Sequence, residues 1–496
     1  MQPAVFSPLN YAILFAYMAG MLAIGWIFAG RQKTTEEYFL AGRRMPWLIV
    51  AMSMFASLTS AVTYMGLPAA AFTENISLIV VCIISPLVAP VLIFVFYPVF
   101  CRLRVTTSYE YIGLRFGRPA RFAVSALFIL ARLGWLGTVI YAPAVALSVV
   151  TGLPLWSAIL LMGLIATAYT VLGGITADIW TDVVQFIIMV VGAAWLATTL
   201  LTRVPGGLHG ILTAAGEAGR LHVFNTRLSL FEMSGWMVAV AFFFQLMQDY
   251  GTDQTTVQRL MTTSDFRGVV KAILFNAATD FVLIGLLLFL GIGMFAYYAA
   301  FPNLLPPGTA GDRVLPYYII HALPNGVSGL LVTAIFAAAM SSMDSGISSL
   351  STVVVNDFVR PLRRVARPDT HDLNLARLLT FVLGALATGI AFFVSSFEHV
   401  IQAYTTIISL FSGPVLALFL LGLFSRRASF AAWVVGCAVS IPSTLVIQYV
   451  VKVHWIYYFP FAFGVTLILG LLATLLLPSA PADPALLFSF RRPGRQ

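Results

Sequence analysis

Long apolar runs separated by short polar breaks dominate this chain. A helix needs about 20 mostly apolar residues to cross the ~30 Å hydrocarbon layer of a bilayer, and runs of that length recur along almost the whole sequence. The pattern therefore predicts an all-α integral membrane protein with about thirteen transmembrane helices. They are expected over 8–29, 46–72, 77–101, 122–150, 154–172, 180–202, 233–258, 268–297, 325–355, 376–395, 399–424, 428–450 and 456–477.

Basic residues fall in alternate loops between these runs. Of the 28 Lys and Arg residues, 22 lie in one set of loops, among them Arg31, Arg259 and the C-terminal Arg491, and five lie in the opposite set. Because short cytoplasmic loops carry the basic excess, the N-terminus is expected outside and the C-terminus in the cytoplasm. An odd number of spans satisfies this orientation, so the sequence predicts a multi-pass protein of the plasma (inner) membrane.

Composition narrows the function classes. Hydrophobic residues make up 60% of the chain and charged residues 9%, with a formal net charge of +9, which excludes an ordinary soluble protein. The basic loops suit membrane lipid rather than nucleic acid. The three cysteines and six histidines are scattered, which favours neither a disulfide framework nor a His/Cys metal site. None of Lys33, Lys271 and Lys452 lies in a GxxxxGK[ST] motif, so no nucleotide-driven motor is indicated.

The second predicted span is unusually rich in hydroxyl groups, within SMFASLTSAVTYMG. Polar groups at membrane depth are costly and are therefore candidates for function. These hydroxyls could loosen the helix and free backbone carbonyls toward a cavity, or could simply bond back to their own helix. The residues concerned are Ser53, Ser57, Thr59, Ser60 and Thr63.

The seventh and ninth predicted spans carry the other polar clusters. The seventh ends in QLMQDYGTDQTTVQR, an implausible sequence for an unbroken lipid-facing helix, although its last part could be the cytoplasmic end of the span. Two interrupted spans in corresponding positions are typical of an inverted-repeat transporter. The ninth contains AIFAAAMSSMDSGISS, whose polar residues share one side of a helix at about 100° per residue. A small-residue packing face would explain the alanines there but not Asp344.

Three further charges lie within predicted spans. Asp182 lies about one turn inside the cytoplasmic edge of the sixth span, while Arg132 and Asp280 are isolated charges to which the sequence assigns no partner. The side chain of Arg132 could also extend from the span to a membrane surface and need no partner within the membrane. Carbonyl and serine oxygens of low total charge suit Na⁺, and one added carboxylate suits a second cation site.

These segments, together with GGITADIWTDVVQ and the N-terminal NYAILFAYMAGMLAIGWIFAGRQKTTEEYFLAGRRMPW, resemble the sodium:solute symporter family over nearly the whole chain. The resemblance implies an inverted five-helix repeat fold and sodium-driven uptake by alternating access. It also implies four parts. These are an extra N-terminal helix and cytoplasmic loop (1–45), a first repeat (46–232), a second repeat (233–424), and two C-terminal helices with a tail (425–496).

The resemblance further implies where sodium binds. The main site corresponds to backbone carbonyls of Ala56, Thr59 and Ala338 and hydroxyls of Ser341 and Ser342. A second site described in some relatives corresponds to Asp182, Ser341 and Ser345. Asp344 stands where those relatives have serine and is expected to add negative charge to the second site.

The solute pocket implied by the resemblance departs from that of bacterial sialic acid symporters. Where they offer a threonine, an aromatic residue, a glutamine and a carboxylate-binding arginine, this chain has Leu58, Leu78, Cys82 and Trp135. The stretch GTVIYAPAVALSVVTGLPLW instead resembles the monocarboxylate, vitamin and iodide branch. Other candidate contacts are the polar Ser60 and Thr63 and, on the inner side, Gln248 and Tyr250.

The sequence therefore predicts sodium-coupled import of a small organic solute, an anion such as a monocarboxylate or a sialic acid. The alternative is an uncoupled facilitator or channel that uses the same polar seam. An intramembrane enzyme built on Asp182 and Asp344 or on a serine nucleophile is disfavoured, because no histidine accompanies them at membrane depth.

Overall fold

The structure is a computed structural model that describes residues 6–489 except 228, 310, 364–367, 395–399 and 478; the side chains of 149–150 and 400–407 are also outside the description. The predicted basic C-terminal tail, with Arg491, Arg492 and Arg495, lies outside the described residues. Within them the chain is helical, and the one extended pairing is an isolated bridge between Met45 and Thr263. The all-α prediction is confirmed.

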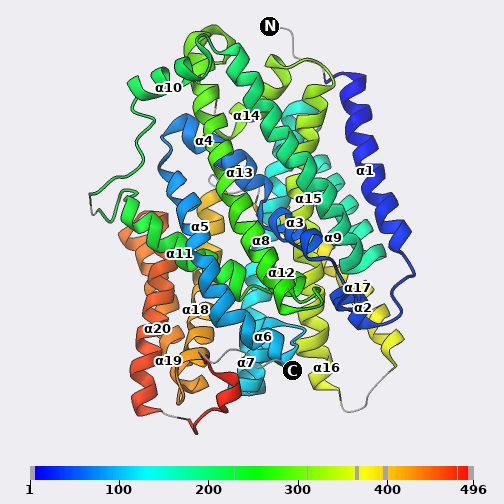
Figure 1. Cartoon of the computed structure of the whole chain (residues 1–496), viewed down its shortest axis with the longest axis vertical. Coiled ribbons are helices and arrows are strands. Elements are labelled where there is room, and N and C mark those ends of the chain that lie inside the picture. Colours follow the sequence, from blue (N-terminus) through cyan, green and yellow to red (C-terminus); the bar gives the residue numbers. More distant parts are fainter. Residues whose placement is uncertain are drawn as a thin grey trace.

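Twenty α-helices follow one another along the described part of the chain (Figure 1). They are α1 (Pro8–Phe28), α2 (Thr35–Leu40), α3 (Trp47–Leu58), α4 (Ala61–Thr73), α5 (Val80–Val91), α6 (Tyr97–Leu103), α7 (Ser108–Phe116), α8 (Arg118–Thr151), α9 (Leu155–Arg203), α10 (Gly207–Glu217), α11 (Gly235–Gly251), α12 (Gln254–Leu260), α13 (Phe266–Ala300), α14 (Gly311–Ala322), α15 (Val327–Val353), α16 (Arg360–Leu362), α17 (Asp369–Val394), α18 (Val400–Phe424), α19 (Phe430–Leu445) and α20 (Tyr458–Leu476). Single π-helical turns continue α5, α15 and α19.

The second predicted span is broken as expected. Helix α3 ends at Leu58, Thr59 has non-helical backbone angles, and α4 restarts at Ala61 with a bend of 61° between the two. Ser60 caps the new helix, because its hydroxyl accepts a hydrogen bond from the backbone N–H of Thr63. The break leaves the last carbonyls of α3 without helical partners, and these carbonyls become available for other contacts.

The polar end of the seventh predicted span is also broken. Helix α11 ends at Gly251, and Asp253 caps α12 by accepting a hydrogen bond from the N–H of Thr255. Every residue of α12 is buried, from Gln254 to Leu260. The polar segment is therefore inside the protein and not at a cytoplasmic surface.

Helix α9 covers two of the predicted spans, 154–172 and 180–202, in one element of 49 residues. It is interrupted at Gly174, whose φ of 57° lies in the left-handed region. A Cβ at this position would lie 2.7 Å from the Tyr38 ring, so glycine is required for space as well as for conformation. The two predicted spans thus meet at a glycine hinge without an intervening loop.

Helix α15 lies in the middle of the bundle (Figure 1). Every residue from Leu331 to Val353 is buried, and α15 packs against α1, α3, α8, α9 and α17. Alanines and serines along it allow these close approaches. The polar residues of α15 are therefore enclosed by other helices and shielded from lipid.

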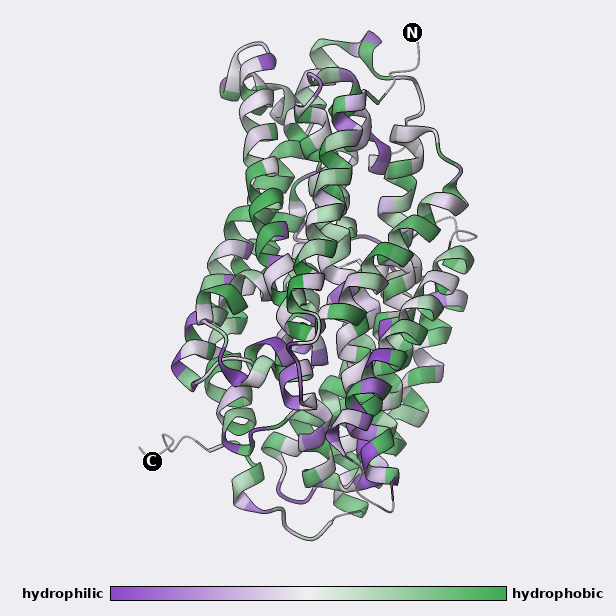
Figure 2. Cartoon of the chain, turned by 90° about the vertical axis from the view of Figure 1, so that its right-hand side faces the viewer, coloured by the Kyte–Doolittle hydropathy of each residue, from purple (hydrophilic) through white to green (hydrophobic). Residues whose placement is uncertain are grey.

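Nine described helices are long and apolar enough to cross a membrane, or ten if the bent pair α3–α4 counts as one span. Helix α9 counts once among them, and the apolar part of α18 whose side chains are described, Ile408–Phe424, is shorter than a full span. The total of thirteen remains a prediction. Figure 2 shows hydrophobic residues along the outer helices and hydrophilic residues gathered mainly toward one end of the molecule.

Candidate functional site

The broken end of α3 lies directly against α15. The hydroxyl of Ser341 donates hydrogen bonds to the carbonyl of Ala56 at 2.8 Å and to that of Ala338 at 3.2 Å, and the hydroxyl of Ser342 donates to the carbonyl of Ser57 at 3.0 Å. Both hydroxyls are completely buried. Four of the five residues expected at the main sodium site are thereby in one place, and Thr59 is at the helix break beside them.

Asp182 of α9 lies next to these contacts between the end of α3 and α15, which form the seam between the two helices. Its Oδ2 accepts hydrogen bonds from Ser53 at 2.6 Å and from Ser57 at 3.2 Å, and the Ser345 hydroxyl donates to that of Ser57 at 2.7 Å. Oδ1 of Asp182 is buried and has no hydrogen-bond partner among the described residues. An unpaired buried carboxylate oxygen is costly, so the surroundings of Asp182 fit a bound cation.

Arg259 is a candidate site residue that the sequence pattern does not predict. The pattern of basic loops places it at the cytoplasmic side, whereas the structure buries it completely. Its Nε donates to Ser53 at 3.0 Å, and its Nη2 donates to Asp182 at 3.2 Å and also to Ser345. The usable signal in the sequence is that Arg259 is the last residue of TDQTTVQR and directly follows the predicted span 233–258.

Asp344 lies on the same part of α15 but bonds toward α9. Its Oδ2 accepts hydrogen bonds from Tyr169 at 2.8 Å and Thr181 at 3.5 Å, and its Oδ1 accepts from the N–H of Ser345 at 2.5 Å. Asp178, also on α9, has both carboxylate oxygens buried without a hydrogen bond among the described residues. Carboxylates therefore outnumber cations where α9 meets α15.

The donor set suits a hard monovalent cation. In the described part of the chain, no cluster of three or more His, Cys, Asp or Glu side chains could hold a metal ion. Carbonyl and hydroxyl oxygens of α3 and α15 supply the main group, and one carboxylate, Asp182, supplies the neighbouring group. Such oxygens are the ligands that alkali and alkaline-earth ions prefer.

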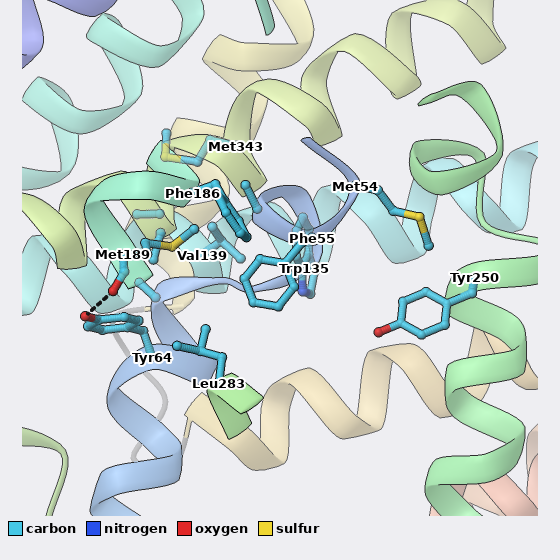
Figure 3. Packing of buried hydrophobic residues seen from close by; sticks show 14 of the residues in the cluster. Met54, Phe55, Tyr64, Trp135, Val139, Phe186, Met189, Tyr250, Leu283 and Met343 are labelled. Atoms are coloured by element: carbon cyan, nitrogen blue, oxygen red, sulfur yellow. Dashed lines mark hydrogen bonds between the residues drawn. The ribbon is translucent and has the colours of Figure 1, made fainter. Parts of the chain in front are cut away.

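A cavity of about 360 Å³ opens beside the break in α3. Of the expected solute contacts, Leu58, Ser60, Thr63, Leu78, Trp135 and Tyr250 line it. Figure 3 shows Trp135 and Phe55 on one side and Tyr250 of α11, its ring directed toward them, on the other. The remaining two candidates, Cys82 and Gln248, are buried and do not line the cavity. Gln245, one helical turn before Gln248, does line it.

Arg132 lines this cavity and is paired. Its Nη2 contacts Oδ2 of Asp253, while its guanidinium lies 4.4 Å from the Trp135 ring centre and 5.5 Å from that of Phe128. The other oxygen of Asp253 accepts the N–H of Thr255 that starts α12. Arg132 therefore faces the cavity, one helical turn before Trp135, and does not extend to a membrane surface.

Asp280 of α13 also lines the cavity. Its Oδ2 accepts hydrogen bonds from Tyr250 at 2.5 Å, Ser85 at 2.7 Å and Asn276 at 3.0 Å. These donors come from α11, α5 and α13, so the carboxylate joins three helices. Both charges that the sequence left isolated thus belong to the wall of one cavity.

Comparison with known proteins identifies the chain. The family model described as "Sodium:solute symporter family" matches residues 38–437. The chain belongs to the sodium:solute symporter family. It is 31% identical over 461 residues to a sodium/sialic acid symporter of Proteus mirabilis, with 92% of this chain and 93% of that protein covered. It is 32% identical to the bovine (Bos taurus) sodium-coupled monocarboxylate transporter 2 over 85% of this chain and 68% of that protein.

Solved structures agree with this family. A substrate-bound, outward-open sodium-coupled sialic acid symporter superposes with a TM-score of 0.90 at 30% identity, covering 96% of this chain and 99% of that one. Mhp1, a nucleobase-cation-symport-1 family transporter in a closed conformation, superposes with a TM-score of 0.55 at 14% identity and shows the shared fold alone. The prediction of an inverted-repeat transporter fold is confirmed. The present chain is a multi-pass sodium-coupled solute symporter.

Proposed function

We propose that this symporter imports a small organic anion, such as a monocarboxylate or a sialic acid, across the plasma membrane together with Na⁺. The relatives named above carry sialic acid or monocarboxylates with sodium. The observation that carries the coupling is the contact of the Ser341 and Ser342 hydroxyls with the carbonyls at the end of α3. We further propose that the N-terminus is outside, that the C-terminus is cytoplasmic, and that the chain catalyses no reaction.

In this proposal the main sodium site uses Ala56, Thr59, Ala338, Ser341 and Ser342. Carbonyls freed by the break in α3 face hydroxyls of α15, so an ion bound there touches both helices. A bound ion would replace two hydrogen bonds between these helices, at 2.8 and 3.0 Å, by ion–oxygen contacts. Sodium binding is thereby tied to the relative position of α3 and α15.

The proposed second sodium site uses Asp182, Ser341 and Ser345. The unpaired Oδ1 of Asp182 supports it, because a cation would satisfy this buried oxygen. Asp344 lies beside Ser345 and adds negative charge there. Arg259 already contributes one positive charge to Asp182, so it tunes the affinity of the ion at this position.

The proposed solute site is the cavity beside these ions, with Leu58, Leu78 and Trp135 as apolar wall and Ser60, Thr63 and Tyr250 as polar contacts. Arg132 is the guanidinium that could receive a carboxylate, since only its Nη2 is engaged with Asp253. Cys82 and Gln248 would pack behind the residues that line the cavity. We also propose the repeat boundaries 46–232 and 233–424, which place the breaks of α3–α4 and α11–α12 in corresponding spans.

The energetics are adequate for accumulation. A monovalent anion that enters with one Na⁺ moves no net charge, so a tenfold sodium gradient, worth about 1.4 kcal/mol, supports about tenfold accumulation. A second Na⁺ adds another ~1.4 kcal/mol and about 2.3 kcal/mol from a potential of about 100 mV, which together support roughly 5,000-fold accumulation.

The test is solute uptake into proteoliposomes into which the purified protein has been reconstituted. A panel of labelled monocarboxylates and sialic acid is offered with an inward sodium gradient, and the same gradient of choline serves as the control. Symport predicts uptake above the equilibrium level that collapses in choline. Uptake that persists in choline and stops at equilibrium would overturn the proposal and favour the facilitator.

A further inference from the structure

The cavity wall holds more carboxylates than cations. Among the described residues that line it, the acidic ones are Glu74, Asp249, Asp253 and Asp280, and the one Arg or Lys is Arg132. His454 also lines the cavity, but burial lowers the pKa of its ring below the usual value, which favours the neutral form. A solute that brings only negative charge would meet an excess of the same sign.

The single guanidinium does not offset this excess, because its charge is already matched. Arg132 pairs with Asp253, which is itself held in place as the cap of α12. Asp280 has no cation within ion-pair distance in the part of the chain that the structure describes, and neither has Asp249. Both carboxylates line the cavity that receives the solute.

Asp280 is the better placed of the two to recognise a ligand. Its side chain is 7% exposed, and all three hydrogen bonds from Tyr250, Ser85 and Asn276 go to Oδ2. Oδ1 has no partner among the described residues, yet it is not one of the fully enclosed unpaired oxygens. Three donors from three helices therefore fix the carboxylate and leave one oxygen for the cavity.

We propose that Asp280 binds a positively charged ammonium group of the solute, so that the cargo is a zwitterion carrying both an ammonium and a carboxylate. This rests on two parts of the proposed function, the sodium symport and the approach of a carboxylate to Arg132, and it replaces the net anion proposed there by a carboxylate that also carries an ammonium group. The two charged groups of such a cargo add no net charge to the cavity, whereas each would find a partner of opposite sign on its wall. The apolar side chains of Leu58, Leu283 and Trp135 then suit the body of the molecule.

The experiment compares matched solutes that differ only in the amino group. The melting temperature of the purified protein is followed in fixed sodium while leucine or 4-methylpentanoate, phenylalanine or 3-phenylpropionate, and 4-aminobutyrate or butyrate are titrated. We expect at least one amino member to stabilise the protein at a concentration at least about tenfold lower than its partner, because a buried group left unpaired penalises the analogue. 3-Methylbutylamine, which lacks the carboxylate, should bind more weakly than leucine.

Asp280→Asn tests the residue itself. The substitution keeps the shape and hydrogen-bonding capacity of the side chain and should remove the preference for the amino member of the pair. Asp312→Asn, which changes an exposed carboxylate on α14, is the matched control and should keep the preference. If Asp280→Asn does not fold, the comparison of solutes on the unaltered protein still decides the proposal.

Three results would overturn the inference. In the first, only the carboxylates without an ammonium group, 4-methylpentanoate, 3-phenylpropionate or butyrate, stabilise the protein, or no member of the panel does. In the second, Asp280→Asn retains the preference. In the third, Asp280→Asn weakens stabilisation by sodium alone, which would assign the carboxylate to an ion. Sodium-dependent uptake of pyruvate or N-acetylneuraminate would then leave the proposed symport intact, whereas uptake of the bound solute that ignores sodium would refute the symport itself.

Discussion

Replacing Ser342 by alanine removes one hydroxyl from the seam between α3 and α15. In the structure this hydroxyl donates to the carbonyl of Ser57 at 3.0 Å. With sodium bound, the same oxygen would be a ligand of the ion. The substitution leaves the backbone and the small volume of the side chain almost unchanged, so its main effect should fall on sodium affinity.

The size of the change in sodium affinity follows from the contacts of the Ser342 hydroxyl in the two states, without sodium and with sodium bound. A neutral hydrogen bond contributes about 1 kcal/mol and a contact with a charged group about 1.5–3 kcal/mol. The alanine variant loses both, and only the difference, about 0.5–2 kcal/mol, reaches the binding equilibrium. The half-saturating sodium concentration should therefore rise about 2- to 30-fold.

The assay needs no knowledge of the solute. The melting temperature is measured as NaCl replaces choline chloride at constant ionic strength, and fitting the rise to a stabilisation of RT ln(1 + [Na⁺]/Kd) gives the sodium affinity. Ser351→Ala is the matched control on the same helix, because its hydroxyl donates to the Ala376 carbonyl of α17 at the same 3.0 Å but away from the proposed site. Unchanged sodium dependence of Ser342→Ala, or an equal shift in Ser351→Ala, would refute the assignment.

Three further substitutions test other parts of the structure. Asp182→Asn should lower the charge moved per solute, measured from transport currents and labelled uptake in the same proteoliposomes, and an unaltered ratio would remove the second ion. Arg259→Met should reduce the free energy of unfolding by about 3–5 kcal/mol, because it leaves a buried carboxylate without its cation; a melting temperature equal to that of the unaltered protein would contradict this. Gly291→Ala places a Cβ 2.4 Å from the carbonyl oxygen of Pro68 and should destabilise by about 1–3 kcal/mol, whereas Gly285→Ala on the same helix meets nothing within 4 Å and should be tolerated.

The sequence was sufficient for the parts of the site that depend on one helix or one break. The periodicity of α15 places Ser341, Ser342 and Ser345 together, and the hydroxyl-rich segment around Thr59 does break the helix as predicted. The family motifs then bring the two segments to one site. These features are local, so short-range sequence patterns encode them.

The sequence does not predict contacts between side chains of different helices, because these contacts depend on how the helices rotate and cross. Asp253, the ion-pair partner of Arg132, and Tyr250 and Ser85, two of the donors to Asp280, lie far away in the sequence, and nothing in the local pattern of α8 or α13 indicates them. The same limit explains Arg259, which looks like a loop residue until α12 is found to be buried. Helix orientation is set by packing over the whole bundle, which a single sequence does not display.

The seam between α3 and α15 has a consequence for the transport cycle. An ion held there would act as a removable cross-link, because its ligands come from two separate helices and it strengthens their junction only while it stays. Release of the ion into a sodium-poor compartment would loosen the same junction, so return to the starting geometry would become easier once the driving ion has gone. Because α15 has no lipid-facing surface along Leu331–Val353, such loosening would be transmitted to every helix that surrounds it.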